Sequence, residues 1–538
     1  MRVADFFCGA GGFSEGFRIQ GFDVIFGLDN WAPAIATHKF NHPEAKHHLG
    51  NILEIKPEEI DKLIPDTEII IGSPPCVSFS GSNKAGKADK SLGTALIEKF
   101  LQIIAVKKNK KGSKLKYWLL ENVPNSKKHI KKSYTFKELN LPGGSKTALE
   151  IPVRKVLNSA DYGTPQTRSR FVCGEYLLPE KVSNNQAYIT MCEVMDNLGE
   201  PLSKKKELVK DICWNFNIDG KDLTDHYYDT RVQEFEWKAA RRLKEDHGFM
   251  GKMSFPEELN RPSRTVMATQ SAVSRESILF GTRNPEVYRL PTIREIACFM
   301  SFPITYQFEA NSEVAKNRLV GNAVCPKLSS ALAKTIKDSE KLNLLISIDK
   351  EVKKPSLDLT GKKRKQKIQG NRRPIAKFRR HIPYLKKVSL RVDLDNLDSD
   401  FNNKDFKWRV VLHRGTGKGA KQSQPILSVV KEVLKRHDSD VFENFYKELE
   451  SSFDEGIPRA NKFQENYVKN DINALGPEKA LERIKEAIDK IYPEEQYGNF
   501  LLQVDDNDFC IGRYDLPIRI VAGLYACLWF VKRIGKNN

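Results

Sequence analysis

The chain has 538 residues, 40% hydrophobic and 29% charged, which is typical of a soluble globular protein. One hydrophobic core cannot serve so long a chain, so about two to four structural units are expected. Lysine and arginine outnumber aspartate and glutamate by 88 to 69, a formal net charge of +19. This excess favours a polyanionic partner such as nucleic acid, although a lysine-rich surface kept soluble by its charge has the same composition.

Cysteine usage and hydropathy exclude further classes. None of the nine cysteines forms a CxxC pair, so no metal site is expected, and the odd count is typical of free thiols in a reducing compartment. The N-terminus has the pattern of a strand and a turn rather than of a signal peptide. The most apolar stretch, Ile518–Val531, is shorter than the ~18 residues that span a membrane and is expected to lie in a core.

The first part of the chain alternates apolar runs with helical patterns. The predicted strands are Arg2–Phe7, Asp23–Leu28, Glu68–Ile71 and Tyr117–Leu120, and the predicted helices are Phe13–Gln20, Ala32–Phe40 and Ala95–Lys107. This alternation predicts an α/β unit with a parallel sheet covered by helices. Ligands of such sheets bind beyond the carboxyl ends of the strands.

A glycine-rich turn, Asp5–Phe13, lies between the first predicted strand and the first helix. Glycines let the backbone turn tightly and approach a ligand closely, although many such turns bind nothing. The second strand is followed by Asp29, a carboxylate well placed to accept hydrogen bonds from a ribose. No Walker lysine follows the turn, which speaks against a nucleoside triphosphate.

The third strand leads into Gly72-Ser-Pro-Pro-Cys76, where two prolines restrict the backbone and hold one thiol at the carboxyl edge of the sheet. A lone cysteine is more often a small buried apolar residue. The residues after Cys76 form a polar loop rich in glycine and serine, which is poor core material. We therefore interpret Cys76 as a functional thiol.

Glu121 follows the fourth strand, which places it at the same sheet edge as Cys76. Burial there would raise its pKa and let it hold a proton, whereas the alternative is that it only caps a helix. Arg168 and Arg170 alternate, so both lie on one face if their segment is extended. Two guanidinium groups on one face suit a phosphate or a carbonyl.

The alternation fades after residue 175 and ordered patterning returns near Arg261–Val266. A helix is predicted at Thr292–Phe299, and a loop followed by a helix over Asn317–Ile336. Residues 351–380 carry twelve lysines and arginines against two acidic residues and have few large apolar side chains, which predicts a linker that does not fold alone. This linker either contacts phosphates or is a solvated tether.

Together and in this order, the motifs resemble those of the DNA cytosine-C5 methyltransferase family of bacterial restriction–modification systems. The matching segments, which span residues 1–336, are DFFCGAGGFSEGF (5–17) for the cofactor motif, GSPPCVSFS (72–80) for the nucleophile motif, ENV (121–123) for the glutamate motif, QTRSR (166–170) for the arginine motif, and RPSRTV (261–266) and RLVGNAVCP (318–326) for the last motifs. The resemblance implies a Rossmann-like S-adenosylmethionine-dependent methyltransferase fold with an inserted target-recognition domain, followed here by an extra C-terminal α+β domain.

The resemblance also implies roles for individual residues. Cys76 would be the nucleophile, Glu121 the proton-handling carboxylate, and Arg168 and Arg170 the substrate-orienting pair. The implied cofactor-binding residues are Phe7, Gly9, Ala10, Gly12, Asp29, Asn30, Asn51, Ile52, Pro75, Asn322 and Val324. Asn51 stands where the family often has an acidic residue, so an altered adenine contact is expected. Cys325, before the proline of the last motif, is expected only to adjust a turn.

The implied organisation is a catalytic domain (1–172), a target-recognition region (173–260), a return segment (261–340), a basic linker (341–385) and an accessory domain of unknown role (386–538), which is expected to bind DNA or a protein. Candidate DNA contacts in the recognition region, several of which also suit a core, are Trp214, Phe216, His226, Tyr227, Tyr228, Arg231, Arg241, Arg242 and Lys244.

The implied reaction is methyl transfer from S-adenosylmethionine to C5 of a cytosine in a specific double-stranded DNA sequence. It proceeds through a covalent Cys76 adduct on a flipped base, over which the loop Ser78–Gly93 closes. A monomeric cytoplasmic protein at the bacterial nucleoid is expected, with no membrane partner and with a separately encoded restriction endonuclease. The alternatives are a tRNA cytosine-C5 methyltransferase and a non-catalytic DNA-binding protein.

Overall fold

The chain forms two compact units in a computed structural model that describes residues 1–75, 91–182, 188–246, 252–365, 370–387, 390–415, 421–471, 473–504, 509 and 514–535. Unit 1 comprises Met1–Ala240 and Ser254–Lys365, and unit 2 comprises Arg241–Met253 and Gln366–Asn538. Each unit has its own hydrophobic core. Within the described residues, every helix is too short or too polar to cross a membrane.

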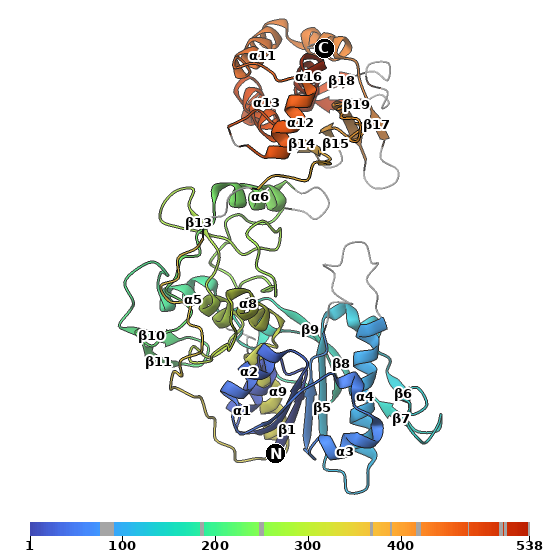
Figure 1. Cartoon of the computed structure of the whole chain (residues 1–538), viewed down its shortest axis with the longest axis vertical. Helices are drawn as coiled ribbons and strands as arrows, with labels where there is room; N and C mark the ends of the chain where they lie inside the picture. Colours follow the sequence, from blue (N-terminus) through green and yellow to red (C-terminus); the bar gives the residue numbers. More distant parts are fainter. Residues whose placement is uncertain are drawn as a thin grey trace. The chain divides into compact units, whose positions relative to one another are not determined.

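Unit 1 is built on a seven-stranded sheet with the order β3-β2-β1-β4-β5-β9-β8 (Figure 1). The strands are β1 (Arg2–Phe6), β2 (Asp23–Asp29), β3 (Lys46–Leu49), β4 (Ile69–Gly72), β5 (Tyr117–Asn122), β8 (Val153–Asn158) and β9 (Ser169–Glu175). β1 to β5 are parallel, whereas β9 runs antiparallel to both β5 and β8. The parallel strands therefore end at the same edge of the sheet.

Helices cover both faces of this sheet, because successive strand residues point to opposite sides. Val3 packs with α1 (Gly12–Ile19) and α9 (Pro326–Ser339), whereas Ala4 packs with α3 (Ile60–Leu63) and α4 (Ser91–Asn109). In Figure 1, α1 and α9 lie on one side of the sheet and α3 and α4 on the other. The Rossmann-like α/β fold predicted from the sequence is confirmed.

The predicted elements differ from the observed ones in several places. β5 continues through Glu121 and Asn122, so Glu121 lies in the strand rather than after it. The segment Asn317–Ile336 was predicted to begin as a loop, but its first residues are the end of helix α8 (Glu313–Asn322). This helix begins where the Ser312 hydroxyl accepts a hydrogen bond from the Ala315 N–H. The antiparallel strands β8 and β9 were not predicted, because their alternation is too short to be distinguished from a loop.

The remaining elements of unit 1 are short and joined by long loops. They are α2 (Ala32–Asn41), β6 (Ser133–Thr135), β7 (Ala148–Glu150), α5 (Met191–Leu198), β10 (Leu208–Asp211), β11 (Phe216–Asp219), the start of α6 (Glu234–Glu245), β12 (Phe280–Gly281), β13 (Tyr288–Arg289) and α7 (Ile293–Phe299), with single 3₁₀ turns η1 (Ile52–Glu54), η2 (Pro57–Glu59), η4 (Pro124–Lys128) and η5 (Ser159–Tyr162). Six of the candidate DNA contacts are buried and belong to the protein interior: Trp214, Phe216, His226, Tyr227, Tyr228 and Lys244.

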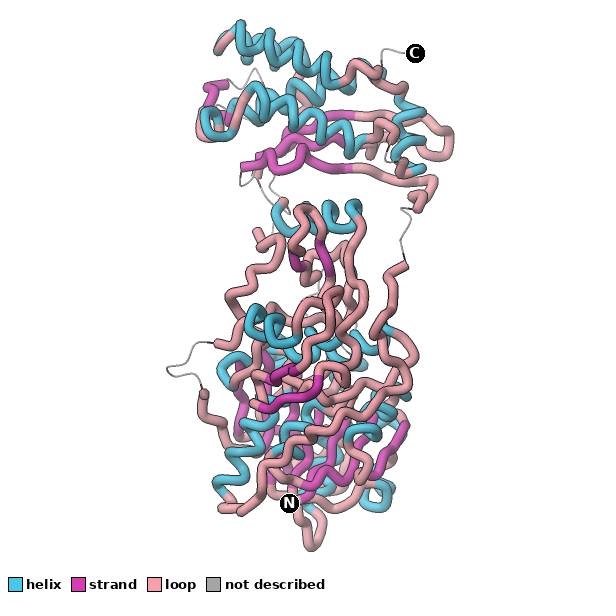
Figure 2. The backbone as a smooth tube through the Cα atoms, turned by 90° about the vertical axis from the view of Figure 1, so that its left-hand side faces the viewer, coloured by secondary structure: helices cyan, strands magenta, loops and turns pink. Residues whose placement is uncertain are grey.

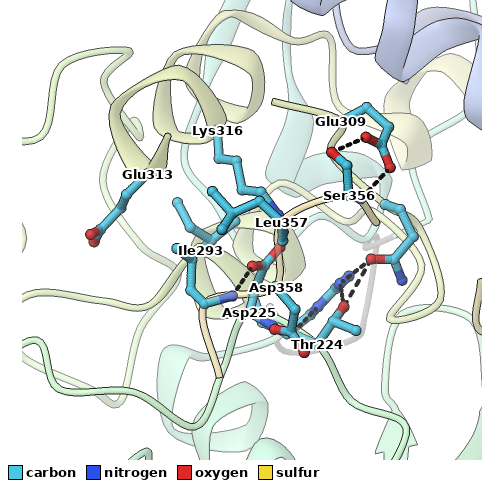
Figure 3. A network of polar contacts seen from close by, with 12 residues as sticks. Thr224, Asp225, Ile293, Glu309, Glu313, Lys316, Ser356, Leu357 and Asp358 are labelled. Carbon is cyan, nitrogen blue, oxygen red and sulfur yellow. Dashed lines mark hydrogen bonds and ion pairs between the residues drawn. The ribbon is translucent and has the colours of Figure 1, made fainter. Parts of the chain in front are cut away.

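The segment 341–365, expected to be part of a linker, packs on unit 1. Leu359 is buried in its core, and the Leu359 N–H donates a 3.0 Å hydrogen bond to Asp225. Asp225 also forms a 2.6 Å ion pair with Lys316 of α8. The Lys316 ammonium group donates a second hydrogen bond to the Leu357 carbonyl. Figure 3 shows Lys316, Asp225 and Leu357 meeting from three separate segments. A few spaced leucines therefore pack this segment against the core of unit 1, a contact that the composition of the segment does not predict.

Unit 2 packs helices against one face of a four-stranded antiparallel sheet, β14-β15-β16-β17 (Figure 2). Its elements are β14 (Arg379–Lys387), β15 (Leu390–Asp395), β16 (Arg409–Arg414), β17 (Lys421–Ser423), α10 (Leu427–His437), α11 (Ser439–Ser452), α12 (Ala460–Lys469), α13 (Pro477–Ile491), α14 (Glu494–Tyr497), β18 (Leu501–Val504), β19 (Tyr514–Pro517) and α16 (Ile518–Gly535). The apolar stretch Ile518–Val531 lies in α16 at the centre of this core, as predicted.

The buried pair Lys316–Asp225 gives a test of how segment 341–365 stabilises unit 1. In Lys316→Met, Asp225 stays buried without its cation, so we expect the free energy of unfolding to fall by about 3–5 kcal/mol. Lys334→Met removes the exposed ion pair with Asp338 and should change it by less than about 1 kcal/mol. Urea denaturation of the two variants measures both values. Equal effects would mean that the buried pair contributes no more than a surface one.

Candidate active site

A cavity of about 700 Å³ lies at the carboxyl edge of the parallel strands in unit 1. Its walls come from the first glycine turn, the ends of β2, β4 and β5, the start of β9 and the end of α8. This volume is in the range of small-molecule sites. Residues more than 300 positions apart in the chain, such as Phe7 and Val324, therefore line the same space.

One end of the cavity is formed by the glycine turn and Asp29. The Gly9 N–H and the Trp31 N–H each donate a 2.9 Å hydrogen bond to the Asp29 carboxylate. Partial burial raises the pKa of Asp29, and the hydrogen bonds from Trp31 and Gly9 oppose that rise. Each carboxylate oxygen keeps a further lone pair that can accept a hydroxyl hydrogen bond.

Gly12 lies beside this turn and does not line the cavity. A Cβ at position 12 would be 2.1 Å from the Val324 carbonyl oxygen, which no side chain tolerates. Glycine is required here so that the start of α1 can touch the last motif. Gly12 therefore allows Val324 to take its place in the cavity wall but does not itself line the cavity. The family resemblance implied that Gly12 would surround the cofactor directly.

A buried polar chain runs behind the glycine turn. The Ser14 hydroxyl donates a 2.7 Å hydrogen bond to Asp5 and lies 3.0 Å from His38 Nε2, while His38 Nδ1 lies 2.9 Å from His47. Burial, opposed by the Ser14 hydrogen bond, raises the pKa of Asp5 to about 8. Burial also lowers the pKa of His38 to about 3, so both side chains are neutral near pH 7.

The other end of the cavity holds a buried carboxylate and two arginines. Arg170 Nε makes a 3.0 Å ion pair with Glu121 Oε1. Burial raises the pKa of Glu121, and Arg170 and Arg168 oppose that rise. Arg168, 3% exposed, donates hydrogen bonds to the carbonyls of Val266 (3.2 Å), Gly321 (3.0 Å) and Ala323 (3.1 Å). The two arginines both line the cavity but have different partners.

Comparison with known proteins identifies the family. The sequence model for C-5 cytosine-specific DNA methylases matches residues 1–338. The chain belongs to the C-5 cytosine-specific DNA methylases. It is thus a DNA cytosine-C5 methyltransferase, as the family resemblance implied.

Relatives cover nearly two thirds of this methylase. The type II methyltransferase M.MthTI of Methanothermobacter thermautotrophicus is 29% identical over 353 residues, covering 63% of this chain and 97% of its own. M.HindV of Haemophilus influenzae is 28% identical over 345 residues, covering 63% and 98%. The crystal structure of the Dnmt2 methyltransferase of S. pombe has 15% identity and a TM-score of 0.43, covering 64% and 100%.

The cavity of the methylase brings together nearly all the predicted site residues. Those that line it are Phe7, Gly9, Ala10, Asp29, Asn30, Asn51, Ile52, Pro75, Glu121, Arg168, Arg170, Asn322 and Val324. Cys76 and loop residues 78–90 lie outside the described residues, although Pro75 in the cavity wall directly precedes Cys76. The Asn51 side-chain oxygen caps η1 by accepting from the Leu53 N–H, so its amide is partly committed to the chain itself.

Several further cavity residues were missed by the sequence reasoning, among them Trp31, Arg318 and Asn125. Trp31 follows Asp29 closely, and Arg318 lies one helical turn before Asn322, with its guanidinium carbon 4.5 Å from the centre of the Trp31 ring. Asn125 lines the cavity from the turn after β5. Proximity to a recognised motif was the only signal for these residues, because the cation–π contact joins positions 287 residues apart (318 − 31).

The raised pKa of Asp5 predicts a pH effect on the stability of the methylase. An unfolded aspartate loses its proton near pH 4, whereas folded Asp5 keeps its proton to about pH 8. The folded state therefore binds more protons in this window, and stability falls as the pH rises, by at most about 1.4 kcal/mol per pH unit from this group. In Asp5→Asn this contribution is absent, so urea midpoints should fall less between pH 5 and pH 8 than in the wild type. Parallel declines would refute the assignment.

Proposed function

We propose that this methylase transfers the methyl group of S-adenosylmethionine to C5 of a cytosine in a specific double-stranded DNA sequence, through a covalent adduct on Cys76 and a flipped base. One observation carries the proposal. Asp29 beside the glycine turn and the Glu121–Arg170 pair line a single cavity, whose wall at Pro75 leads directly to Cys76.

The residues at the glycine-turn end fit the cofactor. A nucleoside needs a hydroxyl acceptor, which Asp29 provides, and apolar walls, which Phe7, Leu28 and Ile52 provide. Backbone of the glycine turn and Asn322 would enclose the remainder of the molecule. When bound, S-adenosylmethionine supplies an electrophilic methyl carbon on a sulfonium.

The chain's own groups make cytosine C5 nucleophilic. The Cys76 thiolate adds to C6, and the C5–C6 π electrons shift through the ring to N3, which takes a proton from Glu121. Burial supports this role, because it raises the pKa of Glu121 and so favours the protonated acid. After the methyl group is on C5, N3 returns its proton to the Glu121 carboxylate, and loss of the C5 proton to a base restores the C5–C6 double bond and expels the Cys76 thiolate.

The arginines have separate proposed tasks. Arg170 orients the Glu121 carboxyl through their 3.0 Å contact and stabilises its anion once the proton has moved. Arg168 contributes a fixed positive charge, which favours the thiolate form of a nearby cysteine. Its own position is set by the three backbone carbonyls that it binds.

The proposal also covers access to the target base, the biological role and the remaining regions of the chain. Cytosine C5 is inaccessible inside a duplex, so the base must rotate out, at a cost of a few kcal/mol that DNA contacts offset. M.MthTI and M.HindV are named type II methyltransferases, which supports a restriction–modification role with a separately encoded endonuclease. We further propose that residues 173–260 read the target sequence and that residues 386–538 are an accessory DNA-binding or protein-interaction domain.

Cys76→Ser tests the nucleophile. Serine is not ionised near neutral pH, so we expect no methyl transfer from labelled cofactor to duplex DNA and no trapped adduct with DNA that contains 5-fluorocytosine. Cys298→Ala is the matched control, since Cys298 lies outside both the cavity and residues 173–260, and it should keep wild-type activity. Wild-type rates in Cys76→Ser would rule out the covalent route.

Glu121→Gln tests the acid. An amide keeps the shape but has no carboxyl proton to give to N3, so kcat should fall by about 10²–10⁴-fold while the affinity for cofactor stays close to that of the wild type. Equilibrium binding of the cofactor and single-turnover rates of methyl transfer separate the effect on affinity from the effect on kcat.

Bisulfite sequencing of the methylated duplex, with tRNA as the competing substrate, identifies both the target sequence and the class of nucleic acid that is methylated.

A further inference from the structure

A lysine-rich turn follows the strand that carries Glu121. Residues 127–132, with the sequence KKHIKK, contain four lysines and no acidic residue, and we refer to them as the lysine turn. It begins in η4, two residues after Asn125, which lines the cavity together with Pro124. The lysine turn therefore starts within a few residues of the cavity wall.

The base of this turn is tied to the segment that leads to the nucleophile. The Asn122 side chain donates a 3.0 Å hydrogen bond to the Pro74 carbonyl, and its oxygen accepts from the Val123 N–H. The Ser126 hydroxyl donates to the Val123 carbonyl at 2.7 Å. The end of β5 and the start of η4 are thus fixed relative to the Pro74-Pro75 segment.

Arg154 holds the turn itself. From β8, its guanidinium donates to the carbonyls of Lys131 (2.6 Å), Ile130 (2.7 Å) and Lys127 (3.1 Å). The same group lies 5.4 Å from the centre of the Phe171 ring, next to Arg170 in β9. Ile130 is 3% exposed and anchors the turn in the core. Arg154 thus fixes the backbone of a turn whose lysine side chains are exposed.

The lysines of the turn are available to a partner. Lys127, Lys128 and Lys132 are exposed, and within the described part of the chain none of them makes an ion pair. Lys131 alone is paired, with Glu138 at 2.7 Å. Exposed ammonium groups on a rigid backbone bind anions without the entropy cost of ordering a loop. Their spacing along one turn suits successive phosphates of a nucleic-acid strand rather than one small anion.

We propose that the lysine turn is a DNA-backbone site, in which Lys127 and Lys128 bind phosphates beside the cytosine that enters the cavity and Arg154 is a positioning residue for them. This rests on the proposed function, because it takes the substrate to be duplex DNA. The contacts lie outside the recognition region and carry no sequence information, so they add affinity and hold the strand next to the extruded base.

The test compares Lys127→Gln/Lys128→Gln with wild type in the full-length protein, using a fluorescein-labelled duplex of mixed sequence titrated at several salt concentrations. Loss of two phosphate contacts should reduce the slope of log K against log[salt] by about 1.8 and weaken binding roughly ten- to hundredfold at about 0.1 M salt. The matched control is Lys111→Gln/Lys114→Gln, which removes the same charge from two exposed lysines between α4 and β5, at the opposite edge of the sheet.

An unchanged slope, or the same change in the control, overturns the proposal. Methyl transfer by the wild type is measured separately, so a protein that methylates DNA with an unaltered slope refutes only the lysine turn, and one that does not methylate DNA refutes the proposed function. Arg154→Met should raise the KM for DNA and leave both kcat and cofactor affinity unchanged, with partial recovery in Arg154→Lys. A fall in cofactor affinity would show a merely structural role for Arg154.

Discussion

The site depends on one guanidinium group that joins three distant parts of the chain. Arg168 lies just before β9 and binds carbonyls of Val266, Gly321 and Ala323, 98 to 155 residues further along. An arginine keeps its charge when buried, so these hydrogen bonds are charge-assisted and strongly favoured over leaving the group unpaired. They hold the return segment and the end of α8 against the edge of the sheet, and the cavity takes its walls from all three.

The same burial sets the protonation of the groups around the cavity. Asp5 behind the glycine turn and Glu121 at the other end both have raised pKa values, because removal from water disfavours a charged carboxylate. Their partners differ: Asp5 has a neutral hydroxyl from Ser14, whereas Glu121 has Arg170. One fold thus holds an acid beside a neutral hydroxyl and a second acid beside a guanidinium group that opposes the effect of burial.

The chain beyond the matched family region divides between the two units. Residues 341–365 complete unit 1, since Leu359 lies in its core and Lys316 of α8 binds both Asp225 and the Leu357 carbonyl. Residues 366–538 form most of unit 2, with a core of their own around α16. The predicted boundary at residue 385 marks where a basic segment gives way to one of mixed composition. The boundary between the two compact units lies earlier, between residues 365 and 366.

Motifs in the sequence determined the family, the sheet with its carboxyl edge, and many of the residues that line the cavity. They succeeded because glycine turns, strand ends and the order of motifs are local in the chain. Only the tertiary structure decided that Arg168 binds backbone carbonyls while Arg170 pairs with Glu121, that Gly12 supports Val324 instead of lining the cavity, and that a basic segment packs beside Lys316. Each of these contacts joins residues far apart in sequence, where burial and partner geometry, which no local pattern encodes, select the interaction.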